Sequence, residues 1–466
     1  MLFNSIEYIT LLTISLFAYW LTTSLKIRQW VVLGSSIYFY MSWSQIFIIM
    51  LLAMIGVNWF LGKKLDQTKD RYWLIFAGIF NLGLLAYFKY MNFFLDNIQQ
   101  IGQMYSPSFE TPILSIILPL GISFYVFELI SYQADIYRGK IEHENNPVVF
   151  AIFVLFFPHL IAGPICRAGQ FIPQIHVLQR MNAAQVYRGL YFFLAGFALK
   201  CGIADGISPF VNVIFEAPEN YSGFDNLMAT IGFGVQILCD FWGYSLMALG
   251  AALLFGYSLP HNFNLPYASL SIRDFWRRWH MTLSSWLRDY LYIALGGSRT
   301  NAAWKVQRNL ALTMLLGGLW HGASWNFIIW GAIHGVALVI NRWFELTNTP
   351  KWFDNIFRWP PLAWFLTIGT VFASWVYFRA TSFEDASTML HHIYTPAINW
   401  TETKLAPEFF ELMLLYFPLQ YLIHRTTYKN DIAFLPIWKA TMASTFLAVF
   451  SFLYYVDGND FIYFQF

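Results

Sequence analysis

The stretch GGLWHGASWNFIIWGAIHG, from Gly317 to Gly335, places two histidines in a long apolar segment rich in glycine and tryptophan. It lies within residues 309–341, which join two basic segments through roughly 33 mostly apolar residues. A single membrane-spanning helix needs only about 20 residues. Residues 309–341 are therefore predicted to enter and return as two short helices or as a re-entrant hairpin. The turn falls on GGLWHGASW and puts His321 at the tip, where protein or water must surround the non-helical backbone.

The composition of the chain is that of a membrane protein. Of its 466 residues, 58% are hydrophobic, 20% are aromatic and only 12% are charged, whereas a soluble domain has about 25% charged residues. Apolar runs of about 20 residues, each long enough to span a bilayer, alternate with short charged loops. We therefore expect one all-α polytopic membrane domain over residues 1–466, with about 11 spans besides re-entrant and interfacial helices.

Charge is distributed unevenly between alternate loops. Basic residues gather in the segments 26–28, 63–71, 138–140, 273–308, 342–358 and 425–439. Acidic residues occupy the loops near 96–111, 209–225 and 381–406 and the tail after Val456, where Lys404 is the single basic residue. By the positive-inside rule the basic set is cytoplasmic and both termini face outward. Residues 29–61 also join two basic segments, so they are predicted to form a second hairpin that turns at YMSWSQ.

Several classes of site are not indicated by the sequence. Cys166, Cys201 and Cys239 are scattered without CxxC spacing, so neither a disulfide framework nor a metal site is expected. The pair His391–His392 also lacks a third ligand, and adjacent positions diverge on a helix. No nucleic-acid-binding module and no glycine-rich phosphate loop is present.

A second informative stretch is SLSIRDFWRRWHMTLSSWLRDYLYIALGGSR, upstream of the hairpin. Ser271 with Asp274 forms a capping box, and two glycines at 296–297 supply a stop, so residues 272–295 are predicted to form one helix. At helical spacing, one face carries Arg273, Arg277, His280, Ser284 and Arg288. Two interpretations remain open: an interfacial helix whose basic face touches anionic lipid headgroups, or a helix lining a cytoplasmic vestibule, which also accounts for the histidine.

Isolated polar residues in apolar segments are functional hypotheses by default. Asp240, in LCDFWGY, is predicted to need a buried partner. Glu128 and Asp135 share a helix face, and either could orient a histidine. His334 follows His321 in more regular helix and is expected to make an interhelical hydrogen bond.

Several motifs resemble those of one family. They are DFWRRWHMTLSSWLRDYLYIALGGSR, NLALTMLLGGLWHGASWNFIIWGAIHG, FFPHLIAGPICRAGQFIPQI, CDFWGYSLMALGAALLFGY and the terminal FIYFQF. In this order they are similar to the signature of the membrane-bound O-acyltransferases over nearly the whole chain, with the signature region at 262–341. LIAGPICR and FIYFQF resemble the bacterial branch that O-acetylates polysaccharides such as alginate more than the D-alanyl transfer branch.

The resemblance implies a fold and a site. The fold would be a ring of tilted transmembrane helices with re-entrant hairpins around a central funnel. His321 corresponds to the essential histidine and would act as general base, and His280 corresponds to the second motif histidine. The thioester oxygen would accept a hydrogen bond from His280, Trp320 or Asn326. The donor, acetyl-CoA or another acyl thioester, would place its phosphates on Arg273, Arg277, Arg278 and Arg288. No cofactor is implied, and Asp240 and His334 are supporting polar groups.

The location and partners follow from the same resemblance. We expect a multi-pass protein of the bacterial inner membrane, with a separate periplasmic SGNH-hydrolase-like acetyltransferase completing transfer to the polymer, because the outer loops are short. D-alanyl transfer from a carrier protein is the alternative within the enzyme class. A transporter would show internal repeats with paired broken helices, and none is evident.

Overall fold

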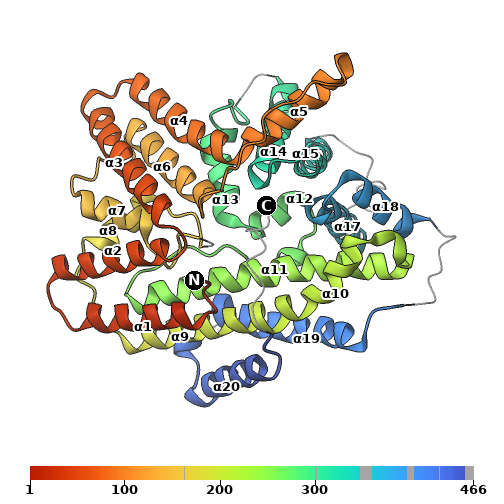
Figure 1. The fold of residues 1–466 in the computed structure, drawn as a ribbon. Helices are drawn as coiled ribbons and strands as arrows, with labels where there is room; N and C mark the ends of the chain where they lie inside the picture. The colour runs from red at the N-terminus through yellow and green to blue at the C-terminus, as the bar shows by residue number, and fades with distance from the viewer. Residues whose placement is uncertain (162, 300–301, 347–358, 396–402, 430, 457–466) are drawn as a thin grey trace. The chain divides into compact units, whose positions relative to one another are not determined.

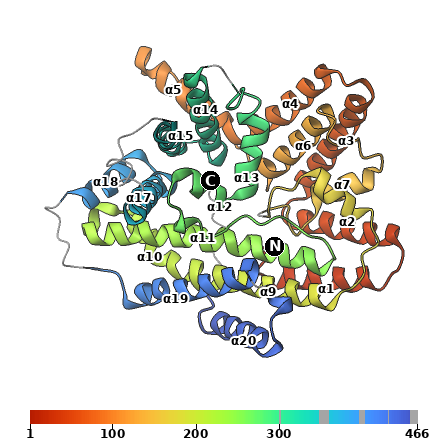
Figure 2. The same cartoon turned by 180° about the vertical axis from the view of Figure 1, so that it is seen from behind.

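The computed structural model describes the chain except residues 162, 300–301, 347–358, 396–402, 430 and 457–466. The FIYFQF ending and parts of the predicted 342–358 and 381–406 segments therefore lie outside the described residues. Every regular element in the described part is a helix (Figures 1 and 2), which confirms the all-α class. Among the described residues, six helices are long and apolar enough to cross a membrane: Gln45–Thr68, Arg71–Tyr105, Ala183–Glu216, Gly223–Leu254, Trp325–Glu345 and Pro360–Arg379. The chain is a multi-pass membrane protein.

The helices form two compact units. The first comprises residues 1–182, 251–259 and 322–324, and the second comprises residues 183–250, 260–321 and 325–466. The first unit contains α1 (Ile6–Trp20), α2 (Leu25–Met41), α3 (Gln45–Thr68), α4 (Arg71–Leu85), α5 (Met91–Tyr105), α6 (Ile122–Tyr137), α7 (Pro147–Leu155) and α8 (Ala168–Ile175). The turn between α2 and α3 falls inside YMSWSQ, so this predicted helix–turn–helix is confirmed.

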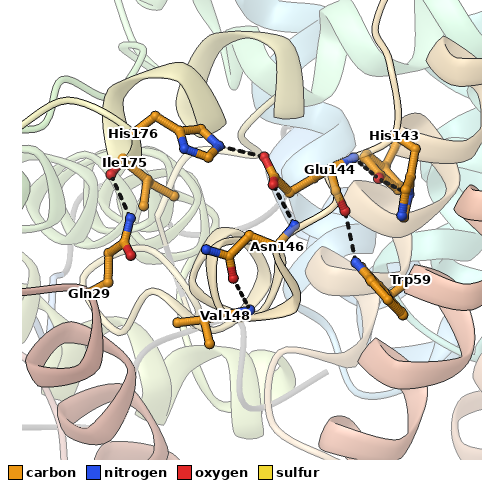
Figure 3. Close-up of polar contacts among 9 residues, drawn as sticks. Gln29, Trp59, His143, Glu144, Asn146, Val148, Ile175 and His176 are labelled. Atoms are coloured by element: carbon orange, nitrogen blue, oxygen red, sulfur yellow. Dashed lines mark hydrogen bonds and ion pairs between the residues drawn. The ribbon is translucent and has the colours of Figure 1, made fainter. Parts of the chain in front are cut away.

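Polar contacts hold the helices of the first unit together. Asn58 on α3 and Asn81 on α4 exchange side-chain hydrogen bonds of 3.0 and 2.8 Å, and both residues are buried. In the loop after α6, the Glu144 carboxylate lies 2.6 Å from the His176 ring (Figure 3). The backbone carbonyl of Glu144 accepts a hydrogen bond from Trp59 of α3 at 2.8 Å. The buried Asn58–Asn81 bonds satisfy groups that would be costly to leave unpaired away from water, whereas the His176 ring is about half exposed.

The second unit contains the other α-helices of the described residues. They are α9 (Ala183–Phe197), α10 (Asp205–Glu216), most of α11 (Gly223–Leu254), α12 (Ile272–Arg278), α13 (Met281–Trp286), α14 (Ala303–His321), α15 (Trp325–Leu346), α17 (Pro360–Arg379), α18 (Phe383–Tyr394), α19 (Pro407–His424) and α20 (Ile437–Leu453). A π-helical turn, Ala198–Ala204, joins α9 to α10, and another, Leu287–Tyr292, follows α13.

The predicted turn in GGLWHGASW is confirmed, because α14 ends at His321 and α15 begins at Trp325. The two helices pack backbone to backbone through glycine. A Cβ on Gly318 would lie 2.2 Å from the Phe327 carbonyl oxygen, and one on Gly331 would lie 2.5 Å from the Met314 carbonyl oxygen. Side chains at these positions would force the helices apart. The glycines therefore set the close approach that positions His321 against α15.

The prediction of one helix over 272–295 is wrong. The Ser271 hydroxyl does accept the Asp274 amide at 3.1 Å, and Gly296 and Gly297 have positive φ values of 109° and 56°. Between these signals, however, the chain breaks into α12, α13 and the π-helical turn, with His280 in the left-handed region at φ 40°. The loop 262–264 supplies the reason, since its backbone exchanges hydrogen bonds of 2.9 Å with Arg278 and Met281 on either side of the break.

Candidate active site

His321 is the last residue of α14 and is enclosed by aromatic rings. Its ring centroid lies 4.9 Å from Trp320, 4.9 Å from Trp330 of α15 and 5.2 Å from Phe378 of α17. All three rings meet the imidazole close to edge-on, and only 4% of His321 is exposed. Such an enclosure disfavours a permanent charge on the imidazole, because burying a charge among apolar groups is costly.

His280 is also near Trp320, whose ring centroid is 6.5 Å from the His280 ring. The His280 ring also meets Phe241 of α11 at 4.6 Å, and its Nδ1 lies 3.3 Å from the Asn262 side-chain oxygen. The residue is fully buried, and burial lowers the pKa of His280 to about 3, so the ring is neutral at neutral pH. The predicted position of His280 on the basic helix face is wrong, because the left-handed break turns its side chain into the interior.

The arginines of the predicted basic face do come together. Arg273, Arg277 and Arg288 line a cavity of about 500 Å³ that the structure forms between α12, α13, α14 and α15. Ser284 also lines it, although the continuous helix that put Ser284 on the same face as the arginines is broken at His280. A fourth guanidinium, that of Arg342 on α15, also lines the cavity. Arg273 and Arg288 are paired with the carboxylates of Glu345 and Asp289. We call this space the arginine cavity.

Arg342 was not predicted as a site residue. It lies 54 positions after Arg288, and only the folding of α15 against α14 and α12 brings it to the cavity. The one signal in the sequence is its i, i+4 relation to Leu338, which also lines the cavity. That spacing is common to every helix and singles out nothing.

The other predicted donor-binding residues have different surroundings. Arg278 is not among the lining residues; its Nε lies 3.0 Å from the Asp274 carboxylate, and it donates to the Asn264 carbonyl at 3.4 Å. Asn326, at the start of α15, donates to the Ala380 carbonyl at 3.0 Å and is buried. The Trp320 ring is near both motif histidines: its centroid is 4.9 Å from the His321 ring and 6.5 Å from the His280 ring.

His334 links α15 to α17. Its Nε2 lies 3.0 Å from the Ser374 hydroxyl, and its ring meets Trp330 at 4.8 Å and Trp276 at 5.2 Å. The predicted interhelical hydrogen bond is confirmed. Trp330 thus contacts both histidines of the hairpin. His334 packs against one of the rings that enclose His321.

Asp240 has the buried partner that the sequence required. The Lys200 ammonium, in the π-helical turn after α9, lies 2.7 Å from Asp240 and 2.6 Å from Asp205. All three side chains are at most 3% exposed. Because a buried charge needs a close counter-ion, this triad ties α11 to the α9–α10 segment. The next residue on α11, Phe241, is the one that contacts His280.

Comparison with known proteins places the chain in a family. The model of the membrane-bound O-acyltransferase family matches residues 87–378. A protein named "Probable alginate O-acetylase AlgI" from Azotobacter vinelandii is 39% identical over 416 residues, covering 87% of this chain and 80% of the relative. The "Peptidoglycan O-acetyltransferase" of Helicobacter pylori is 39% identical over 395 residues, covering 78% and 73%. The "Teichoic acid D-alanyltransferase" of Bacillus subtilis is 31% identical over 250 residues, covering 52% and 62%. The chain belongs to the membrane-bound O-acyltransferase family and is an O-acyltransferase.

Proposed function

We propose that this chain takes an acetyl group from cytoplasmic acetyl-CoA and passes it across the bacterial inner membrane for O-acetylation of an exported polysaccharide. The observation that carries the proposal is the arrangement of His321 at the tip of the glycine-packed hairpin, inside an aromatic enclosure. The arginine cavity is formed by the same hairpin together with α12 and α13. The relatives named for alginate and peptidoglycan O-acetylation share more of their length with this chain than the D-alanyl relative does.

The arginine cavity suits the donor. Its volume of about 500 Å³ lies within the usual range of small-molecule sites, about 300–1,000 Å³. Guanidinium groups bind phosphates through paired hydrogen bonds that a compact ammonium cannot make. Trp276 and Tyr292 add flat aromatic surface beside the cations. This combination of charge and aromatic surface supports binding of the phosphorylated, nucleotide-containing part of coenzyme A.

His321 would act as the general base. The acceptor hydroxyl gives its proton to a neutral imidazole nitrogen while its oxygen attacks the thioester carbonyl. The carbon–sulfur bond then breaks, and the imidazolium returns the proton to the departing thiolate. Trp320, 4.9 Å from the His321 ring, and His280, 6.5 Å from Trp320, are the nearby groups that could donate a hydrogen bond to the carbonyl oxygen. An imidazole enclosed by apolar rings favours this role, since it resists permanent protonation.

The surrounding topology is part of the proposal. Both termini would lie in the periplasm, and a separate SGNH-hydrolase-like acetyltransferase would receive the acetyl group there. D-alanyl transfer from a carrier protein is the alternative.

Purified full-length protein tests the donor and the base together. Membrane vesicles from the producing bacterium would supply acceptors, and radiolabelled acetyl-CoA and D-alanyl carrier protein would be offered in parallel. We expect thiol release and polymer labelling from acetyl-CoA. His321→Ala should lower the rate by about 10²–10⁴-fold, and the control His391→Ala, which removes an exposed imidazole at the end of α18, should not. Turnover of the D-alanyl donor alone would refute the acetyl proposal, and an active His321→Ala variant would refute the base.

A further inference from the structure

We propose that Glu128, His159 and Cys166 bind a zinc ion in the first unit. One ligand atom from each side chain, a carboxylate oxygen, an imidazole nitrogen and the thiol sulfur, lies within 4.8 Å of the other two. Each residue is at most 2% exposed. Glu128 comes from α6, whereas His159 and Cys166 come from the segment between α7 and α8. The proposal is independent of the acyl-transfer site, which belongs to the second unit.

The chemical types of the three ligand atoms favour zinc over other metal ions. Magnesium and calcium prefer oxygen ligands throughout, whereas a thiolate together with an imidazole and a carboxylate is typical of zinc. Zinc bonds of about 2.0–2.3 Å at tetrahedral angles place neighbouring ligand atoms about 3.3–3.8 Å apart. His159 Nδ1 and Glu128 Oε1 are already 3.6 Å apart. The widest separation in the cluster therefore needs to close by about 1 Å, which side-chain rotation can supply.

A backbone hydrogen bond follows His159 in the segment that carries two of the ligands. The Gly163 amide donates to the His159 carbonyl at 3.0 Å. A Cβ on Gly163 would lie 2.3 Å from His159 Cα, so only glycine fits there. The turn brings Cys166 back towards the histidine that precedes it by seven residues.

Other contacts orient the ligands. Glu128 Oε1 accepts the backbone amide of Cys166 at 2.9 Å, a bond of the kind that fixes metal-bound carboxylates. The His159 ring is held between Phe156 and Phe171, each 5.7 Å away. Its Nε2 is buried and makes no hydrogen bond within the described part of the chain. The nitrogen that faces Glu128 is Nδ1, so zinc would bind at Nδ1 and leave Nε2 as it is.

The two acidic ligands would be charged with an ion bound. Glu128 and Cys166 can contribute two negative charges in a buried site, and the positive charge of Arg167 also acts on both groups. A divalent ion would bind both ligands and fix α6 to the α7–α8 segment. Without an ion, the cluster would be a protonated thiol beside a carboxylate that lies 3.6 Å from the imidazole. Sequence spacing did not suggest a site, because 38 residues separate Glu128 from Cys166.

Metal analysis of the full-length protein in detergent tests the proposal. After dialysis against a weak chelator, we expect about one zinc per chain. Cobalt substituted for zinc should show a thiolate-to-metal charge-transfer band. Cys166→Ser should remove that band and lower bound metal at least tenfold, and Glu128→Gln should lower it as well. The matched control Cys239→Ser changes a buried cysteine of the second unit and should keep full metal content.

Metal binding by the wild-type protein tests the proposal even when a variant fails to fold. Wild-type protein that binds neither zinc nor cobalt, or that binds cobalt without the charge-transfer band, would overturn the proposal. So would a Cys239→Ser variant that loses metal as completely as Cys166→Ser.

Discussion

Replacing Arg277 with glutamine removes one of the four guanidinium groups of the arginine cavity. Arg277 is the most suitable position, since it makes no ion pair among the described residues, whereas Arg273 is 2.5 Å from the Glu345 carboxylate. A charge-assisted hydrogen bond is worth about 1.5–3 kcal/mol. Because each 1.4 kcal/mol is about a factor of ten, the Michaelis constant for acetyl-CoA should rise by about 10- to 150-fold. The turnover number should change little, because the contact lies away from the thioester.

The matched control is Arg278→Gln, one residue further along α12. Arg278 pairs with Asp274 and does not line the cavity, so its loss should leave the Michaelis constant within about twofold. The assay is thiol release by purified protein in uncharged detergent, over a range of donor concentrations. Headgroup attraction is absent there, so a purely lipid-facing role predicts no change for either variant.

Two results would refute this reasoning. If Arg277→Gln and Arg278→Gln raise the constant equally, the effect is one of general positive charge and not of the cavity. If neither does, the donor binds elsewhere. Raising the salt concentration should also weaken donor binding by the wild type more than by Arg277→Gln, since one fewer charge remains to be screened.

Three further predictions concern the scaffold. Gly318→Ala should lower the melting temperature and the transfer rate together, because its Cβ would meet a carbonyl oxygen at 2.2 Å, whereas Gly369→Ala, with nothing within 4 Å, should be tolerated in the same thermal assay. Lys200→Met leaves two buried aspartates without their shared cation and should destabilise the fold by about 3–5 kcal/mol, seen as poor recovery of monodisperse protein; normal recovery would show that the triad is dispensable. Cysteine labelling at positions 305 and 345 should occur from the same side of the membrane, and labelling from opposite sides would contradict the re-entrant hairpin.

Much of the hairpin could be predicted from local sequence. The length of 309–341 and the glycines of GGLWHGASW indicated two helices with a turn beside His321, and α14 and α15 follow that plan. The cap at Ser271 is likewise a local signal, because the groups that form it are neighbours in the chain. Asp240 was predicted to need a partner from energetics alone, since a buried carboxylate is costly without one.

The partners themselves could not be predicted in this way. Nothing near Asp240 in the sequence points to Lys200, 40 positions earlier, and nothing near Arg288 points to Arg342. The break at His280 depends on hydrogen bonds from the loop at 262–264. These bonds replace bonds within a continuous helix, and helical periodicity carries no information about a loop elsewhere in the chain.

The sequence by itself determined that the chain is an all-α membrane protein, where its main hairpin turns and which residues need burial with a partner. These properties follow from hydrophobicity, segment length and chain-local hydrogen bonding, which act between near neighbours. Only the tertiary structure decided which arginines share a cavity, which rings enclose His321, and that Glu128 meets His159 and Cys166. Most of those contacts join residues on different helices, and their geometry is set by how whole helices pack, which no local pattern encodes.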